Sequence, residues 1–418
     1  MTIPARIARE LRERITAGEL SAGDRLESTR VLARQMGVSR GSVVAAYEQL
    51  VGEGYLDTTH GGTRVSAASA PRPRPTAPTP VPKHLRPGLP DGHGLTTTLW
   101  RSSWRAAAAD PQAHPVPGSH RLRSQLAEHL RLTRSVVVDE ESLLVTAGVR
   151  DGLTLLLQAL DPAGTVAVED PGLPTLRRVP AALGRRVVPV SSDEEGIRIA
   201  DLERLKPQVV IVMPNHQYPL GTQMAFQRRL ELLEWARDNG AFLVEDDYDS
   251  ELRRAHPALV ALDPGLDRVA MLGSFAKTLS PALGLGYLIA PEALRERVFA
   301  LATPVSGIVQ DAMAEFLAHD GLRRHTARMR REYRRRQRLF REVFPAGHAM
   351  DGGLHAVIEV ADEAKVVRRA RARGFGVEGL GQYWSSATRD GIVLGLGSEA
   401  NERLRSMLVR LREVIEEG

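Results

Sequence analysis

The residue best suited to covalent chemistry in this chain is Lys277, which follows an apolar run in the sequence Gly-Ser-Phe-Ala-Lys. Of the 56 basic residues, the only lysines are Lys83, Lys206, Lys277 and Lys365. A GC-rich coding sequence explains such a bias toward arginine. Because a guanidinium group cannot form a Schiff base, a lysine that remains can be one that is needed as a primary amine. The alternative is an ordinary surface lysine.

The elements that would position this lysine lie in residues 91–418, where short apolar runs alternate with helical stretches. We expect strands at Leu143–Thr146, Thr165–Val168, Val187–Val190, Val209–Met213, Phe242–Glu245, Val269–Leu272 and Gly286–Ile289. The intervening helices are expected at 120–132, 150–160, 174–183 and 226–239. Strands that alternate with helices predict a mostly parallel sheet. Beyond about residue 300 the pattern is helical, and strands at His355–Val360 and Ile392–Leu396 indicate a small closing subdomain.

Residues 1–66 form a separate pattern. Apolar residues keep helical spacing from Ile3 to Ile15, a second helix fits Thr29–Met36, and Ser39 is a good N-cap for a third helix that runs to about Glu53. A short hairpin follows, around Gly61-Gly62. Two helices joined by a tight turn and followed by a hairpin predict a winged helix-turn-helix.

Residues 67–90 are expected to be a linker. Eight prolines fall between residues 71 and 90. Such a composition favours an extended, semi-rigid chain that could span up to ~75 Å at ~3.1 Å per residue. A packed loop is the alternative.

The segment LESTRVLARQMGVSRGSVVAAYEQLVGEGYLDTTHGGTRV resembles the GntR family of bacterial regulators. In that family the start of the recognition helix enters the major groove, where arginine contacts guanine edges or phosphates, and glycines bring the wing close to the backbone. Glu27 departs from the usual proline. The alternative is a helical interaction module without DNA, and the net charge of residues 1–66, with nine arginines against eight acids, does not decide. The DNA-contacting positions that match are Arg30, Ser39, Arg40, Ser42, His60, Gly61 and Gly62.

The remainder of the chain resembles a fold-type-I aminotransferase, through VEDPG (168–172), PNHQYPLG (214–221), FLVEDDYDSE (242–251) and the segment around Lys277. The whole chain then resembles the MocR subfamily, in which a GntR-type DNA-binding domain is joined to such a domain. The implied fold class is multi-domain: a winged-helix unit (1–66), a linker (67–90) and an α/β unit (91–418). That α/β unit would have a mostly parallel, seven-stranded sheet and a small C-terminal α+β subdomain.

This resemblance implies pyridoxal phosphate as cofactor. Lys277 matches the amine that binds its aldehyde, Asp246 the partner of the ring nitrogen, and Tyr248 the hydroxyl near the ring O3′. The phosphate would take backbone N–H groups at a helix start. The residues matching that phosphate site are Gly148, Val149, Arg150 and Ser274. An ordinary strand-to-loop exit is the alternative for Asp246 and Tyr248.

Three positions depart from the family. Gly284 stands where relatives carry a phosphate-binding arginine, Leu173 replaces the tyrosine that stacks on the ring, and Ala276 replaces the serine before the lysine. A phosphate dianion without its cation costs several kcal/mol. We therefore expect Arg150 to replace the missing arginine. The rival hypothesis is that the chain has given up the cofactor.

The residues that would bind an effector are less clear. No arginine lies in the strand expected at Ile392–Leu396, where a carboxylate-binding arginine is usual, and Arg389 does not align well. His216 and Gln217 belong to the subfamily motif, but loop residues of no special role would look the same. Ten arginines between 323 and 341 lie on the expected inter-domain helix, as a solvated face or as a second DNA surface.

Composition excludes several classes. The chain has 418 residues, 43% hydrophobic residues, a net charge of +5 and no cysteine, which rules out disulfides, Fe–S clusters and cysteine zinc sites. No apolar run approaches the ~18 residues of a transmembrane helix, and we expect a cytoplasmic protein.

We therefore predict a transcription regulator that binds an operator and senses a small molecule, with pyridoxal phosphate on Lys277. The alternatives are a regulator that has lost the cofactor and an active aminotransferase. The resemblance implies a homodimer, and two DNA-binding units then require paired half-sites.

Overall fold

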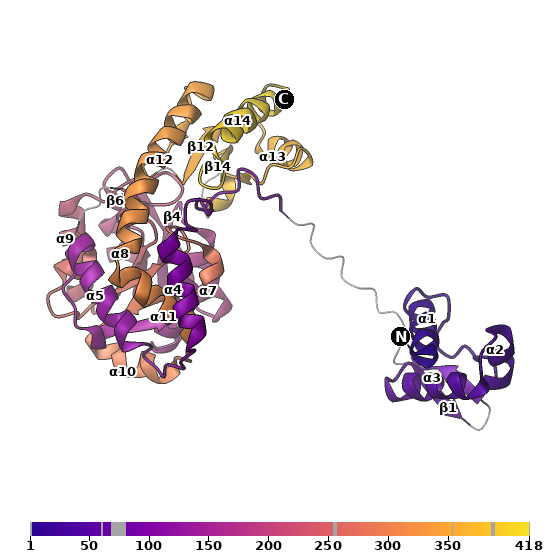
Figure 1. Cartoon of the computed structure of the whole chain (residues 1–418). Coiled ribbons are helices and arrows are strands. Elements are labelled where there is room, and N and C mark those ends of the chain that lie inside the picture. Colours follow the sequence, from indigo (N-terminus) through magenta and orange to yellow (C-terminus); the bar gives the residue numbers. More distant parts are fainter. Residues whose placement is uncertain are drawn as a thin grey trace. The chain divides into compact units, whose positions relative to one another are not determined.

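The computed structural model describes residues 2–59, 62–67, 81–253, 257–352, 354–385 and 389–417. The chain divides into two compact units, residues 1–80 and 81–418, and each is described here by itself (Figure 1). His60 and Gly61, two of the expected DNA-contacting residues, lie outside the described residues. Among the residues that are described, no helix is both long and apolar enough to cross a membrane.

The first unit has the expected order of three helices and a hairpin. Its elements are α1 (Ile3–Thr16), α2 (Thr29–Gln35), α3 (Arg40–Gly52), β1 (Leu56–Thr59) and β2 (Gly62–Val65). Ile7, Leu11 and Ile15 of α1 pack against Val43 and Leu50 of α3 in one apolar core. Ser39 caps α3 as predicted, because its Oγ accepts a hydrogen bond from the Ser42 N–H at 3.2 Å.

The second unit is built on an eight-stranded sheet in the order β3-β10-β9-β8-β7-β4-β5-β6. Strands β4, β5, β7, β8 and β9 run parallel, whereas β10 is antiparallel to both of its neighbours. The expected class is confirmed, but the strand count of seven was wrong. The eighth strand, β6, has only two residues, too few to show a period in the sequence. The strands are β3 (Leu143–Thr146), β4 (Val166–Asp170), β5 (Val187–Asp193), β6 (Gly196–Ile197), β7 (Val209–Val212), β8 (Phe242–Asp247), β9 (Val269–Ser274) and β10 (Gly286–Ile289).

Helices cover both faces of this sheet, because its buried strands offer apolar side chains to each side. One face packs on α5 (His120–Arg134), α8 (Ile199–Leu205), α9 (Phe226–Asp238) and α11 (Gly307–Ala318). The other packs on α6 (Val149–Gln158), α7 (Pro174–Ala182) and α10 (Glu292–Leu301). Helix α4 (Thr98–Ala109) packs on α11, with Trp100 edge-on to Phe316 at 5.2 Å between ring centroids.

The long helix α12 (Gly321–Val343) runs from the large sheet to a smaller C-terminal subdomain, as Figure 1 shows in orange and yellow. That subdomain has an antiparallel sheet in the order β11-β12-β14-β13. Its elements are β11 (His348–Ala349), β12 (His355–Glu359), α13 (Glu363–Ala372), β13 (Glu378–Gly379), β14 (Gly391–Gly395) and α14 (Asn401–Glu416).

Residues 81–90, which we call the anchored segment, correct the linker expected over 67–90. Leu85 is fully buried in the core of the C-terminal subdomain, and its carbonyl accepts the Gly395 N–H at 2.8 Å. The His84 carbonyl accepts the Gly376 N–H at 2.7 Å. The last ten residues of the expected linker are therefore part of the second unit, because tertiary contacts override their proline-rich composition.

Candidate functional site

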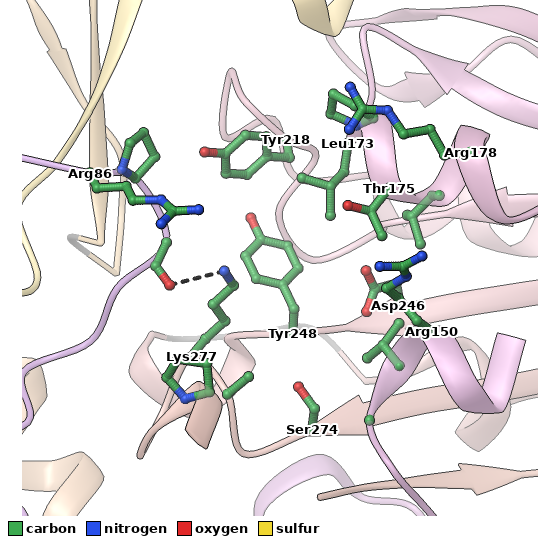
Figure 2. A pocket seen from close by; sticks show the side chains of 18 of the residues that line it. Arg86, Arg150, Leu173, Thr175, Arg178, Tyr218, Asp246, Tyr248, Ser274 and Lys277 are labelled. Carbon is green, nitrogen blue, oxygen red and sulfur yellow. Dashed lines mark hydrogen bonds between the residues drawn. The ribbon is translucent and has the colours of Figure 1, made fainter. Parts of the chain in front are cut away.

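A cavity of about 550 Å³ lies where β8 and β9 end and α6 begins (Figure 2). In sheets of this kind the carboxyl ends of parallel strands form the edge at which ligands bind. Seven of its lining residues are those expected to hold a cofactor: Lys277, Asp246, Tyr248, Ser274, Gly148, Val149 and Arg150. The fold thus brings together residues that are up to 129 positions apart in the sequence, between Gly148 and Lys277.

Lys277 is a cavity residue rather than a surface lysine. Its amine donates a hydrogen bond to the Gly88 carbonyl of the anchored segment at 2.9 Å. Burial lowers the pKa of the Lys277 amine, although the Asp246 carboxylate opposes that shift. A lowered pKa leaves more of the amine neutral, and the neutral amine is the form that attacks a carbonyl carbon.

Asp246 presents an unsatisfied carboxyl group. Its Oδ1 is buried and has no hydrogen-bond partner within the described part of the chain. Burial raises the pKa of Asp246 to about 7, and the neighbouring Asp247 adds to the shift. A buried carboxyl group without a partner is costly, and a cationic N–H donor would satisfy it and favour its ionised form.

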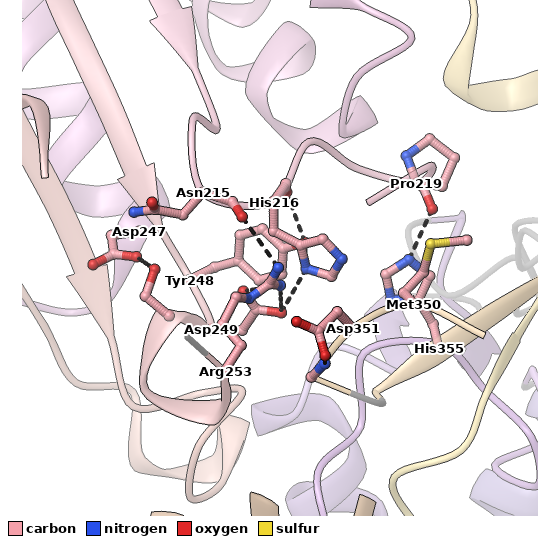
Figure 3. A network of polar contacts seen from close by, with 12 residues as sticks. Asn215, His216, Pro219, Asp247, Tyr248, Asp249, Arg253, Met350, Asp351 and His355 are labelled. Atoms are coloured by element: carbon pink, nitrogen blue, oxygen red, sulfur yellow. Dashed lines mark hydrogen bonds and ion pairs between the residues drawn. The ribbon is translucent and has the colours of Figure 1, made fainter. Parts of the chain in front are cut away.

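Tyr248 is held from behind by a buried polar network (Figure 3). Its hydroxyl donates to the His216 carbonyl at 3.0 Å, and the two rings stack with centroids 5.6 Å apart. The His216 Nδ1 lies 2.8 Å from Asp249, whose carboxylate also pairs with Arg253 at 2.8 Å. Burial would raise the pKa of Asp249, but Arg253 and His216 hold it below its usual value.

This network answers the question that the sequence left open for His216 and Gln217. Both are buried, and neither is among the residues that line the cavity. Gln217 donates to the Pro171 carbonyl, which joins the two motif loops. His216 therefore lies behind Tyr248, and Gln217 contacts the loop at Pro171.

The start of α6 offers backbone donors to the cavity. Gly148 occupies the cap position at φ +112°, a conformation that favours glycine, and no side chain caps the helix. The first N–H groups of a helix have no partner within it, and they carry the positive end of the helix dipole. Ser274 also lines the cavity. These groups suit a phosphate.

Three arginine side chains line the cavity without a hydrogen bond or ion pair to any residue that the structure describes: Arg86, Arg150 and Arg178. All three are exposed. The three departures from the family also lie at this wall: Leu173, Ala276 and Gly284. Gly284, which stands where relatives carry the phosphate-binding arginine, therefore lines the same cavity as these three unpaired guanidinium groups.

The lining residues that were not predicted include Arg86, Arg178, Tyr218, Glu378 and Tyr383. Tyr218 belongs to the motif PNHQYPLG, whose aromatic residue could have been singled out. Arg86 lies in the expected linker, where no local pattern marks it. Arg389 is exposed and is not among the described residues that line the cavity.

The first unit has an uneven distribution of paired charges. Three of the four arginines of α1 form ion pairs: Arg9 with Glu13 at 3.9 Å, Arg12 with Glu53 at 2.6 Å and Arg14 with Glu19 at 3.5 Å. The exposed arginines near α2 and α3 have no ion pair among the described residues of this unit: Arg25, Arg30, Arg34 and Arg40. These four arginines thus leave unpaired positive charge at α2, at the start of α3 and just before α2, which suits a phosphate backbone. The other expected DNA-contacting residues lie nearby in the chain: Ser39 caps α3, Ser42 is in its first turn, and Gly62 begins β2.

The arginine-rich helix is confirmed as α12, but its arginines do not form a uniform solvated face. Arg336 is buried and pairs with Asp91 at 2.5 Å. Arg323 and Arg335 pair with Asp320 and Glu332 on the helix surface. The second DNA surface considered for this helix stays a hypothesis.

Comparison with known proteins found similar proteins for each of the two units. Residues 4–65 match the bacterial regulatory proteins of the gntR family. The second unit resembles solved aminotransferases, which shows its fold. A kynurenine aminotransferase of Pyrococcus horikoshii has a TM-score of 0.71 at 21% identity, covering 81% of this chain and 92% of that one. LysN, the alpha-aminoadipate aminotransferase of Thermus thermophilus, has a TM-score of 0.71 at 23% identity, covering 80% and 92%.

The fold and the site thus define a GntR-type DNA-binding unit joined to an aminotransferase-like domain. The pyridoxine biosynthesis transcriptional regulator PdxR of Corynebacterium glutamicum is 40% identical over 100% of this chain and 97% of its own length. The probable rhizopine catabolism regulatory protein MocR of Rhizobium meliloti is 30% identical over 96% and 92%. The chain belongs to the GntR-type transcriptional regulators of MocR-like architecture.

Proposed function

We propose that this regulator binds pyridoxal phosphate in the cavity of its aminotransferase-like domain and responds there to a small molecule. The observation that carries the proposal is the buried, unpartnered Oδ1 of Asp246 in the same cavity as the Lys277 amine. When bound, pyridoxal phosphate supplies an aldehyde that combines reversibly with amines. In support, the PdxR relative is named as a regulator of pyridoxine biosynthesis, and pyridoxine is the vitamin related to this cofactor.

The described residues fit this cofactor. Lys277 would supply the amine that holds the aldehyde, and Asp246 would accept a hydrogen bond from the ring nitrogen and keep it protonated. Tyr248 would keep its ring at the cavity wall, because His216 fixes its hydroxyl. The start of α6 at Gly148 and Val149, with Ser274, would bind the phosphate.

Arg150 is proposed to take the role of the phosphate-binding arginine that relatives carry at the position of Gly284. It lies at the start of α6, lines the cavity and has no side-chain partner among the described residues. We expect Arg150→Ala to weaken the affinity for pyridoxal phosphate by roughly 10- to 100-fold, as the loss of a charged hydrogen bond costs about 1.5–3 kcal/mol. Titration followed by near-visible absorbance measures this.

Arg101→Ala is the matched control, since Arg101 is an exposed arginine of α4 outside the cavity. It should bind the cofactor like the wild type. Equal affinity of the Arg150→Ala variant and the wild type would remove Arg150 from the phosphate site.

The domain is proposed to sense ligands without sustained catalysis. In support, its relatives are named as regulators, and no arginine from the strand β14 offers the usual carboxylate site. We expect a panel of amino acids with a keto-acid acceptor to give no continuing transamination. Many turnovers per protein would favour an active aminotransferase instead.

The assembly is proposed to be a homodimer in the cytoplasm that binds paired operator half-sites. On the DNA-binding unit, the exposed Arg30 and Arg40 would contact DNA, with Ser39 and Ser42 at the start of α3 and Gly62 at the wing. The roles first expected for His60 and Gly61 stay predictions.

A further inference from the structure

The cavity has unpaired positive charge on two sides. In Figure 2, Arg150 and Arg178 lie at one end of the cavity, and Arg86 lies at the other, beyond Lys277 and Tyr248. The start of α6 shares the first end, where the phosphate would bind. A single phosphate group at that end leaves the Arg86 guanidinium without an anion.

Arg86 is held in place by the way its segment is anchored. A Cβ atom at Gly395 would lie 2.0 Å from the Arg86 carbonyl oxygen, and one at Gly376 would lie 2.0 Å from the Pro82 carbonyl oxygen. Real Cβ atoms do not approach a carbonyl oxygen so closely. The anchored segment can therefore pack against the backbone at these two positions only because both residues are glycine. With Leu85 buried behind it, the anchored segment presents the Arg86 side chain to the cavity from a fixed backbone.

Arg86 is also close to the reactive amine. Gly88, two residues further along, accepts the Lys277 hydrogen bond, and a Cβ atom at Gly88 would lie 2.3 Å from the Lys277 Nζ. The positive charge of Arg86 contributes to the lowered pKa of Lys277. An amine that competes with Lys277 for the same aldehyde carbon must place its nitrogen near the Lys277 Nζ. Its α-substituents then lie within reach of the Arg86 side of the cavity.

Besides Asp246, the acidic residue among the described cavity-lining residues is Glu378, and its Oε2 is engaged by neighbouring side chains. Glu378 accepts hydrogen bonds from the Tyr383 hydroxyl at 2.7 Å and from Gln382 at 3.1 Å. No ion pair joins it to Arg86 within the described ranges. A ligand carboxylate would therefore meet a free guanidinium group, whose planar donors match it in two parallel hydrogen bonds.

We propose that Arg86 binds the carboxylate of an α-amino acid effector whose amine engages the cofactor beside Lys277. This inference rests on the proposed function, since the amine needs the aldehyde of the cofactor. Arg86 is a binding residue that selects amino acids over simple amines. It belongs to the part of the cavity wall that is nearest in sequence to the DNA-binding unit.

The test uses two stable, cofactor-like probes on the full chain. N-(5′-phosphopyridoxyl)glycine carries a carboxylate, and N-(5′-phosphopyridoxyl)methylamine is the same molecule without it. Calorimetric titration of the cofactor-free protein gives the ratio of the two dissociation constants. We expect the wild type to favour the glycine probe by roughly 10-fold or more, and Arg86→Ala to bring the ratio close to unity.

Lys83→Ala is the matched control, because Lys83 is an exposed cation of the same segment that does not line the cavity. It should keep the wild-type ratio. A general loss of structure would weaken both probes alike and leave the ratio unchanged. An unchanged ratio in Arg86→Ala, or no preference in the wild type, overturns the role of Arg86 while the cofactor site stands. If neither probe binds the wild type, the proposed function itself fails.

Discussion

Replacing Lys277 with alanine should abolish the near-visible absorbance that the wild type acquires on incubation with pyridoxal phosphate. The Lys277 amine is the only lysine nitrogen among the described residues that line the cavity, and its lowered pKa favours the neutral, reactive form. No arginine in this arginine-rich site can take its place, because a guanidinium group does not condense with the aldehyde. Absorbance of the dialysed proteins measures the difference.

Reduction with borohydride tests the assignment of Lys277 without relying on the absorbance spectrum. It should fix the cofactor permanently on the wild type, and peptide mass analysis should find the added mass on Lys277. The Lys83→Ala variant should behave like the wild type in both experiments, because Lys83 lies outside the cavity. Labelling of another lysine, or an equal spectrum in the Lys277→Ala variant, would contradict the assignment.

Replacing Arg40 with alanine should weaken binding to operator DNA by about 10- to 100-fold, which corresponds to ~1–3 kcal/mol for a specific base contact. Arg40 is the first residue of α3, is exposed, and forms no ion pair within the described part of its unit. Among the residues that the structure describes, its one polar side-chain contact is a 3.4 Å hydrogen bond to Thr29. Because the start of a recognition helix enters the major groove, this guanidinium group would face the base edges.

Fluorescence anisotropy with DNA from upstream of the protein's own gene measures this affinity. Arg9→Ala is the control, since Arg9 is an exposed arginine of α1 that pairs with Glu13. It should bind DNA nearly as well as the wild type. If both variants lose the same affinity, the contribution of Arg40 is general charge alone, and the assignment of α3 as the recognition helix loses its support.

Much of the fold could be predicted because its strands are buried on both faces. Continuous apolar runs gave β3 and β10 the same bounds as in the structure, Leu143–Thr146 and Gly286–Ile289. The two-residue β6 could not be found, since it pairs with β5 only once the sheet has formed. The anchoring of residues 81–90 was equally hidden, because it depends on Gly376 and Gly395, about 300 residues further along.

The residues of the site also differ in whether local sequence could predict them. Asp246 lies at the end of β8, Tyr248 follows it, Lys277 follows β9, and all three lie within motifs, so local sequence was enough to select them. Arg86 has no such mark: it lies among prolines, and only the tertiary contacts of Leu85 bring it to the cavity. The support of Tyr248 by His216 and Asp249 also depends on distant segments that meet in the folded chain.

The most direct test of the proposed account measures operator affinity with and without pyridoxal phosphate, for the wild type and for Lys277→Ala. A regulator that senses through this cavity must couple its ligand to DNA binding, and such couplings amount to about 5-fold or more. We expect the cofactor to shift the dissociation constant of the wild type by at least this factor and to leave that of Lys277→Ala unchanged. An unshifted constant in wild type saturated with the cofactor, or the same shift in both proteins, would contradict the account.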